Sequence, residues 1–181
     1  MKRSRSSGPA RAPRSRALDR YVRRAGDLGA LGAKLIGPED VFTAEWVRFK
    51  CQYGCDGYGK CLTCPPRSPS PDRTRAMLDG FRSLLLIRGA RWTAVTAAAV
   101  TLEREMFLDG HHRAFAFGAG PCELCPECAL EAGCRHPDRA RPAMEASGID
   151  VFSTARAAGF PIEVVRTRGD AQHYYALVAI E

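Results

Sequence analysis

The sequence lacks the patterns that mark a membrane protein or a nucleotide-dependent enzyme. No apolar run approaches the roughly 20 residues that a membrane-spanning helix needs, and no apolar leader core follows the basic start. There is no G-x-x-x-x-G-K-[ST] loop, no G-x-G-x-x-G fingerprint and no Ser/His/Asp arrangement. We therefore expect no membrane partner, and nothing in the sequence supports nucleotide-driven chemistry.

Excess positive charge is missing from most of the chain and is concentrated at its start. The 181 residues carry a formal net charge of +7. Residues 1–24 alone hold nine Lys and Arg against one Asp, which leaves the remainder close to neutral. The start, MKRSRSSGPARAPRSR, has too few apolar side chains to offset the entropy of ordering it. We expect residues 1–15 to be a disordered basic tail, able at most to bind nucleic acid weakly, and residues 16–181 to form a single cysteine-rich domain.

Cysteine is the residue type that the sequence does contain in an unusual arrangement. All eight cysteines fall in two motifs, C-x3-C-x5-C-x2-C at 51–64 and C-x2-C-x2-C-x5-C at 122–134. In a reducing cytoplasm, where we expect this protein, such close spacing indicates metal or redox chemistry rather than disulfides. The predicted cofactor- and metal-binding residues are Cys51, Cys55, Cys61, Cys64, Cys122, Cys125, Cys128 and Cys134.

Two kinds of metal site use four thiolates, namely structural zinc and iron–sulfur clusters. Zinc sites usually pair two C-x2–4-C knuckles across a longer loop, and neither motif has that form. Cys122, Cys125 and Cys128 have the spacing of the first three ligands in a bacterial-ferredoxin run, although the x5 gap to Cys134 departs from it. The spacing favours one or two [4Fe-4S] clusters, and zinc is the alternative.

Three segments, taken in order, resemble a known family. They are YGCDGYGKCLTCPP, EREMFLDGHHRAFAFGAGPCELCPEC and CRHPDRARPAMEASGIDVFSTARAAG. The chain is similar over roughly residues 33–181 to a prokaryotic family known as predicted metal-binding proteins, a domain of unknown function. The resemblance implies a cytosolic, cysteine-rich, metal- or cluster-binding protein, and it leaves the reaction open.

Three functions are consistent with two thiolate motifs. The first, which we favour, is an iron–sulfur protein with up to two [4Fe-4S] clusters that transfers electrons to a redox partner protein or reduces a small-molecule substrate. The second is a zinc-stabilised binding module, and the third is a metal- or cluster-handling factor. No catalytic residue is assigned, so the sequence does not decide whether the protein is an enzyme.

The pattern of apolar residues predicts an α/β or α+β fold. We expect a small mixed sheet of about four to five strands with helices and two cysteine-rich loops, in a ferredoxin-like topology. Helices are predicted at residues 16–25, 72–81 (with Asp72 as a cap), 93–110, 141–146 and 151–159. Strands are predicted at residues 33–36, 83–89, 114–117, 162–166 and 174–180, the last two forming a terminal hairpin.

Several polar residues have both a functional and a structural interpretation. Arg135, His136 and Arg141 follow Cys134 and either offset the charge of a thiolate-bound cluster or lie on a solvated loop. Glu103 and Glu105 are expected on a solvated helix face, and His111 and His112 are expected to act as helix-end charges. Glu145 and Asp150 could serve a site, and Asp150 could equally cap a helix.

Overall fold

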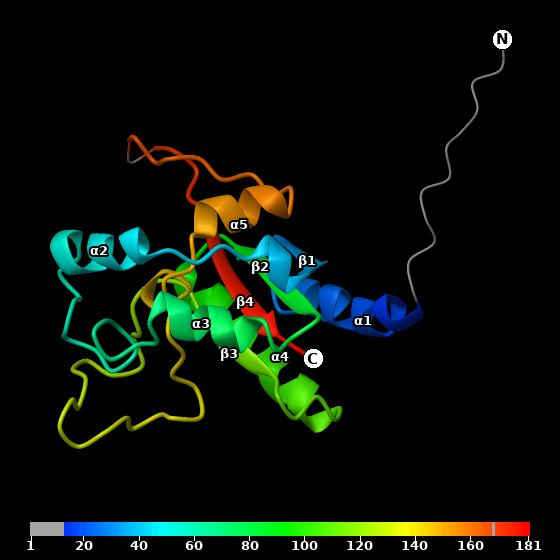
Figure 1. Cartoon of the computed structure of the whole chain (residues 1–181), viewed down its shortest axis with the longest axis horizontal. Coiled ribbons are helices and arrows are strands. Elements are labelled where there is room, and N and C mark those ends of the chain that lie inside the picture. The colour runs from blue at the N-terminus through cyan, green and yellow to red at the C-terminus, as the bar shows by residue number, and fades with distance from the viewer. Residues whose placement is uncertain (1–12, 168) are drawn as a thin grey trace, which may run out of the picture.

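The computed structural model describes residues 13–167 and 169–181 (Figure 1). Residues 1–12 of the expected tail lie outside this part of the chain, and residues 13–15 belong to the first helix. The helices are α1 (Pro13–Asp27), η1 (Pro38–Asp40), α2 (Glu45–Gly54), α3 (Pro71–Leu78), α4 (Trp92–Leu108), η2 (Glu145–Ser147) and α5 (Val151–Ala157), where η denotes a 3-10 helix. The strands are β1 (Gly32–Ile36), β2 (Leu84–Gly89), β3 (Phe115–Phe117) and β4 (Tyr174–Ala179).

The strands form one sheet in the order β1-β2-β4-β3, and all three pairings are antiparallel. The expected class, a small sheet of four to five strands combined with helices, is confirmed, although the sheet is antiparallel throughout and not mixed. The expected ferredoxin-like topology is wrong, because helices separate every pair of consecutive strands here, whereas that topology joins two strands directly. The expected terminal hairpin is also wrong, since β4 pairs with β2 on one side and with β3 on the other.

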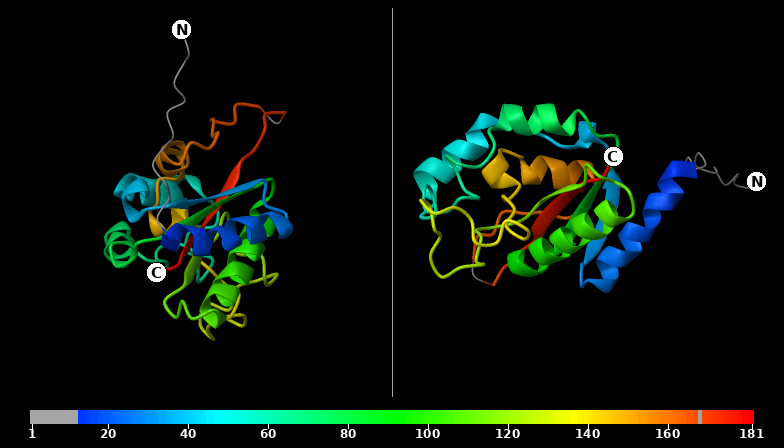
Figure 2. Two further views of the ribbon diagram at one scale, coloured as in Figure 1. Left: turned by 90° about the vertical axis from the view of Figure 1, so that its right-hand side faces the viewer. Right: turned by 90° about the horizontal axis from the view of Figure 1, so that it is seen from below.

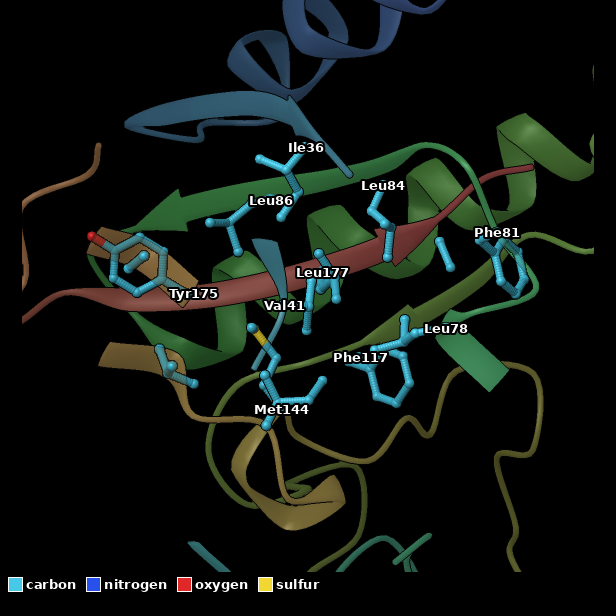
Figure 3. Packing of buried hydrophobic residues seen from close by; sticks show 14 of the residues in the cluster. Ile36, Val41, Leu78, Phe81, Leu84, Leu86, Phe117, Met144, Tyr175 and Leu177 are labelled. Carbon is cyan, nitrogen blue, oxygen red and sulfur yellow. The ribbon is translucent and has the colours of Figure 1, made fainter. Parts of the chain in front are cut away.

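Successive side chains of the central strands point to opposite faces of the sheet, as strand geometry requires. Leu84 and Leu86 of β2 join a buried cluster that includes Leu78 of α3 and Ala155 of α5. Figure 3 shows this cluster around Leu177 and Phe117. Leu85 and Ile87 of β2 enter a second cluster on the other face, under α1 and α4. The sheet is therefore covered by helices on both faces (Figure 2).

Two predicted helices differ in detail from the observed ones. The third helix begins at Pro71, and its N-cap is Ser70, whose hydroxyl accepts a hydrogen bond from the Arg73 N–H at 3.3 Å. The expected cap, Asp72, lies inside the first turn instead. The helix expected at 141–146 is replaced by the single 3-10 turn η2. Pro142 limits helix formation there, because proline cannot donate a backbone hydrogen bond.

The two cysteine motifs leave this scaffold at the same end of the molecule. The first follows α2, and the second follows β3, at the end of the sheet where β3 delivers the chain to Gly118 (Figure 1). The two loops, teal and yellow in Figure 1, lie side by side, and the backbone N–H of Leu62 in one donates a hydrogen bond to Cys128 in the other. The fold thus brings together two motifs that the sequence separates.

Candidate metal centre

The first motif begins on a helix and continues through a chain of turns. Cys51 lies on α2, Cys55 is the C-cap of that helix, and Cys61 and Cys64 follow in the loop. Backbone hydrogen bonds shape the loop, including Cys64 N–H to Cys61 O at 3.1 Å and Gly59 N–H to Pro65 O at 2.8 Å. Gly59 has φ +72°, a left-handed conformation that glycine adopts without steric cost. These turns fold the motif back on itself without extending the helix.

The end of the first loop is fixed to η2 by polar contacts. The Ser68 hydroxyl donates a hydrogen bond to the Ala146 carbonyl at 2.5 Å. Arg48 of α2 donates to the Ser68 carbonyl at 3.0 Å and to the Pro69 carbonyl at 2.5 Å. Because Ser68 is buried, these bonds are shielded from water and hold the loop firmly.

The second motif lies in a loop whose two ends are joined at its base. Gly118 N–H donates to the Pro142 carbonyl and Met144 N–H donates to the Gly118 carbonyl, both at 2.9 Å. Thr96 of α4 accepts a hydrogen bond from Ala119 N–H at 2.9 Å. Gly118 has no room for a side chain, since a Cβ there would lie 2.7 Å from the Thr96 methyl carbon. The loop therefore starts and ends at one point beside α4.

A partly buried ion pair also anchors the second loop. Arg141, near its end, binds Glu103 of α4 through two hydrogen bonds of 2.7 Å, and both side chains are at most 15% exposed. Glu103 also accepts a hydrogen bond from the Ala116 N–H of β3 at 2.9 Å. The Glu103 carboxylate raises the pKa of Arg141. The expectation of a solvated face is wrong for Glu103, because its partner arrives from 38 residues further along the chain.

The other polar candidates have mostly structural partners. Glu105 is only partly exposed and pairs with Arg24 of α1 at 2.8 Å, so the expected solvated face is wrong for this residue too. Asp150 is the N-cap of α5 and accepts hydrogen bonds from the Ser153 N–H and hydroxyl, as its capping interpretation predicts. His111 lies just beyond α4, with Nδ1 3.5 Å from a carboxylate oxygen of Glu181.

The two motifs meet at Cys61. Its thiol lies near enough to those of Cys122 and Cys128, which belong to the other motif, and to that of Cys64 in its own, for these groups to shift one another's pKa. The backbone N–H of Leu62 donates to Cys128 Sγ at 3.4 Å, across 66 residues of sequence. A cavity of about 450 Å³ lies between the loops, and six thiols line it: Cys61, Cys64, Cys122, Cys125, Cys128 and Cys134. Six of the eight predicted ligands therefore line one cavity, and they come from both motifs.

Cys51 and Cys55 lie at the far end of this thiol series. They line a second cavity of about 530 Å³, and they are electrostatically coupled to Cys64 of the main group. The carboxyl group of Glu145 adds to the effect of burial in raising the pKa of Cys51. The eight thiols therefore form one continuous series from Cys51 to Cys134, and all eight are free.

The crowded thiols resist ionisation when no cation is present. Burial raises the pKa of Cys51 and Cys122, and it raises that of Cys64 to about 12. Burial acts in the same direction on Cys61, but hydrogen bonds from Thr63 and the neighbouring thiols outweigh it and lower the pKa. The Leu62 N–H stabilises the Cys128 thiolate, yet burial and Cys61 leave its pKa raised. A bound metal cation supplies the positive charge that such a group of sulfurs needs to lose its protons.

Positive and hydrogen-bonding groups line the same cavity. Arg135 and His136 both face it, in keeping with the first of their two interpretations. The His136 backbone N–H donates to Cys134 Sγ at 3.4 Å, and Arg139 binds the His136 ring nitrogen Nδ1 at 3.0 Å. Arg141 does not take this role, because Glu103 already binds its guanidinium.

The donor set fits a metal-bound group, and the family comparison agrees with it. Thiolates are the ligands that iron–sulfur clusters and zinc share, and here six of them surround one cavity. Within residues 13–167 and 169–181, no group of three or more His, Cys, Asp or Glu side chains is arranged closely enough to hold a single ion.

The chain belongs to the family described as "Predicted metal-binding protein (DUF2284)", which matches residues 34–180. This confirms the resemblance seen in the sequence motifs. No curated protein and no solved structure shows significant similarity to the chain. None of the helices in the described part of the chain is both long and apolar enough to cross a membrane.

Sequence reasoning missed three residues that line the second cavity beside Cys51. They are Trp46 and Lys50 of α2 and His173 just before β4. Lys50 directly precedes Cys51, and Trp46 lies on the same helix. Their position on the helix that carries the first cysteine could have indicated that they lie near the site. His173 carried no such signal, because it is 122 positions from Cys51 and the sheet alone brings it near.

Proposed function

We propose that this metal-binding protein is an iron–sulfur protein with up to two [4Fe-4S] clusters held by its eight cysteines. The observation that carries the proposal is the convergence of six thiols from both motifs on one cavity. Backbone N–H groups of Leu62 and His136 donate to two of these sulfurs, a feature that tunes the reduction potentials of iron–sulfur clusters. The ferredoxin-like spacing of Cys122, Cys125 and Cys128 supports the same assignment.

Such clusters exchange single electrons, so the proposed activity is electron transfer to a protein partner or reduction of a small substrate. The chain's own residues would set the charge around the clusters. Lys60, Arg135 and His136 line the cavity and offset the negative charge of the thiolates. The proposal includes a cytoplasmic location, where a reducing environment keeps the thiols available for metal.

A second candidate function is the handling and transfer of a metal or cluster. Cys55 and Cys134, at the two ends of the thiol series, are exposed, whereas the other six thiols are half-buried. Ligands at an exposed edge are accessible to the thiols of an acceptor protein, which is what transfer by ligand exchange requires.

Anaerobic purification followed by iron, sulfide and zinc analysis tests the proposal. We expect about eight iron and eight sulfide per chain, since two cubanes carry that number. The protein should be brown, because thiolate-to-iron charge transfer absorbs visible light, whereas zinc is colourless. Stoichiometric zinc without sulfide would reject the iron–sulfur assignment and favour a zinc-stabilised module. Loss of clusters to an added apo-acceptor protein would support the transfer function.

A further inference from the structure

The second cavity adjoins the candidate metal centre at Cys51 and Cys55 and extends away from it. Its volume is about 530 Å³, within the range of small-molecule sites. It lies between α2, the segment from η2 to α5, residues 162–165 and the start of β4. Cys51 and Cys55 lie at its boundary, whereas the other six thiols line the first cavity. A molecule bound there would therefore lie next to the first cysteine motif.

Apolar side chains make up most of its wall. Trp46 of α2 and Phe152 of α5 contribute aromatic rings, and Val164 and Val165 contribute aliphatic groups. Trp46 is 46% exposed, and the two valines are 62% and 45% exposed. Apolar groups left open to a concave space are typical of a ligand site. The body of the ligand is accordingly apolar or aromatic.

Two polar groups in this cavity lack a hydrogen-bond partner on any other described residue. The carboxyl group of Glu145 has its own backbone N–H as hydrogen-bond partner and lies near the Cys51 thiol, and among the described residues it forms no ion pair. It reaches solvent only within a space surrounded by protein, and that burial raises its pKa. Nδ1 of His173 is buried without a hydrogen-bond partner. By contrast, both carboxylate oxygens of the neighbouring Asp150 accept hydrogen bonds from Ser153.

The charged side chains that line the cavity indicate which polar group of a ligand fits there. Three carboxyl groups line the cavity, on Glu145, Asp150 and Glu163, against one ammonium group, on Lys50. The Lys50 Nζ lies 5.0 Å from the centre of the Trp46 ring and is held there by the π face. A carboxylate that opens only into a protein-lined cavity and has no ion-pair partner is poorly solvated, and a cationic ligand would supply the missing partner.

We propose that this cavity binds a small organic cation, an amine with an apolar or aromatic body. Glu145 receives the ammonium group, His173 offers a second hydrogen bond, and Trp46 and Phe152 contact the body. The inference rests on the proposed function only where it treats this amine as the substrate of the metal centre; binding itself requires the cavity alone.

Calorimetric titration of the full-length, metal-loaded protein tests the proposal. The probe is 2-phenylethylammonium, compared with 2-phenylethanol and phenylacetate, which present the same ring with a neutral or an anionic group. We expect one site per chain and a preference for the cation of about tenfold or more over both analogues, as a desolvated charge pair provides. Absent binding, equal binding of the three probes or a preference for the anion would overturn the proposal.

Variants locate the site. Glu145→Gln should weaken cation binding by about tenfold and leave the alcohol unchanged. Glu131→Gln is the matched control, because Glu131 is exposed and does not line the cavity. Trp46→Ala should weaken binding of the cation and the alcohol and keeps the proposal testable if Glu145→Gln misfolds. A cation preference that survives both substitutions would refute the assignment.

Metal analysis of the same samples separates the two proposals. Zinc in place of iron and sulfide would reject the iron–sulfur function while the binding data stand. Intact iron and sulfide without amine binding would reject only the present inference.

Discussion

The backbone N–H of Leu62 donates a hydrogen bond to Cys128 Sγ at 3.4 Å, and this bond joins the two cysteine motifs. Next to it, the Cys61 thiol is electrostatically linked to Cys122 and Cys128 of the second motif and to Cys64 of the first. Each motif has four cysteines, so the simplest arrangement from the sequence is one cluster per motif. The position of Cys61 leads us to predict instead that the proposed clusters exchange ligands between the motifs, as occurs in two-cluster ferredoxins.

The central place of Cys61 makes it the most damaging cysteine to replace. Loss of one of the two proposed clusters would remove about half of the iron and sulfide. We expect Cys61→Ser to remove clearly more than half, because serine oxygen is a poorer ligand than thiolate and Cys61 lies between both motifs. Cys51→Ser, at the far end of the series, is the control and should affect one cluster only. Iron analysis and electron paramagnetic resonance measure the outcome, and equal losses in the two variants would contradict ligand exchange.

Metal removal should loosen the two loops and spare the sheet. The loops at residues 55–70 and 119–142 contain turns but no helix or strand, whereas β2 and β4 are paired along their whole length. Hydrogen exchange of the loop amides should accelerate by about tenfold or more in the metal-free protein, while the amides of β2 and β4 stay protected. Mass spectrometry of the two forms measures this, and equal acceleration in the sheet would show that the metal supports the whole fold.

The pair formed by Glu103 and Arg141 should contribute more to stability than the similar pair on the same helix. Glu103→Gln should lower the free energy of unfolding by about 2 kcal/mol, since it leaves a half-buried guanidinium without its carboxylate. Glu105→Gln is the matched control, because its pair with Arg24 is more exposed, and it should cost below about 1 kcal/mol. Urea denaturation measures both, and equal effects would argue against burial as the cause.

Gly148 is a second sensitive position, where backbone and packing act together. It has φ +77°, and a Cβ there would overlap the ring of Pro71 in α3. Gly148→Ala should therefore cost about 3 kcal/mol, the sum of left-handed strain and overpacking. Gly133→Ala isolates the strain, because Gly133 has φ +87° and open space around it; it should cost about 1 kcal/mol. Thermal unfolding compares them, and similar losses would mean that Pro71 yields easily.

Much of the fold could be predicted because local pattern and tertiary packing agree there. The apolar run of β2 and the long Ala-rich α4 are both buried where the sequence places them. The segment 162–166 has strand-forming residues but no strand, because β2 and β3 already occupy both edges of β4. The expected hairpin partner β4 is thus occupied on both sides, and Val164 and Val165 remain exposed.

The cysteines of the site could be named from spacing, but their grouping could not. Spacing within a motif shows that four thiols are close together, and it does not report which thiols of another loop they meet. That information depends on how the folded chain places the loops after α2 and β3 side by side. Glu103 shows the same limit: the charged residues Arg104 and Glu105 follow it and favour a solvated face, whereas Arg141 reaches it only through the folded loop.

The base of the second loop sets a minimum length for that loop. Gly118 and Ala143 are bridged in parallel, so the chain returns beside the point where it left and runs in the same direction. A tight turn reverses the chain and therefore could not replace residues 119–142, because parallel segments need a long connection. A long excursion is thus a requirement of the scaffold itself, and the four thiols are carried on a connection that the fold needs in any case.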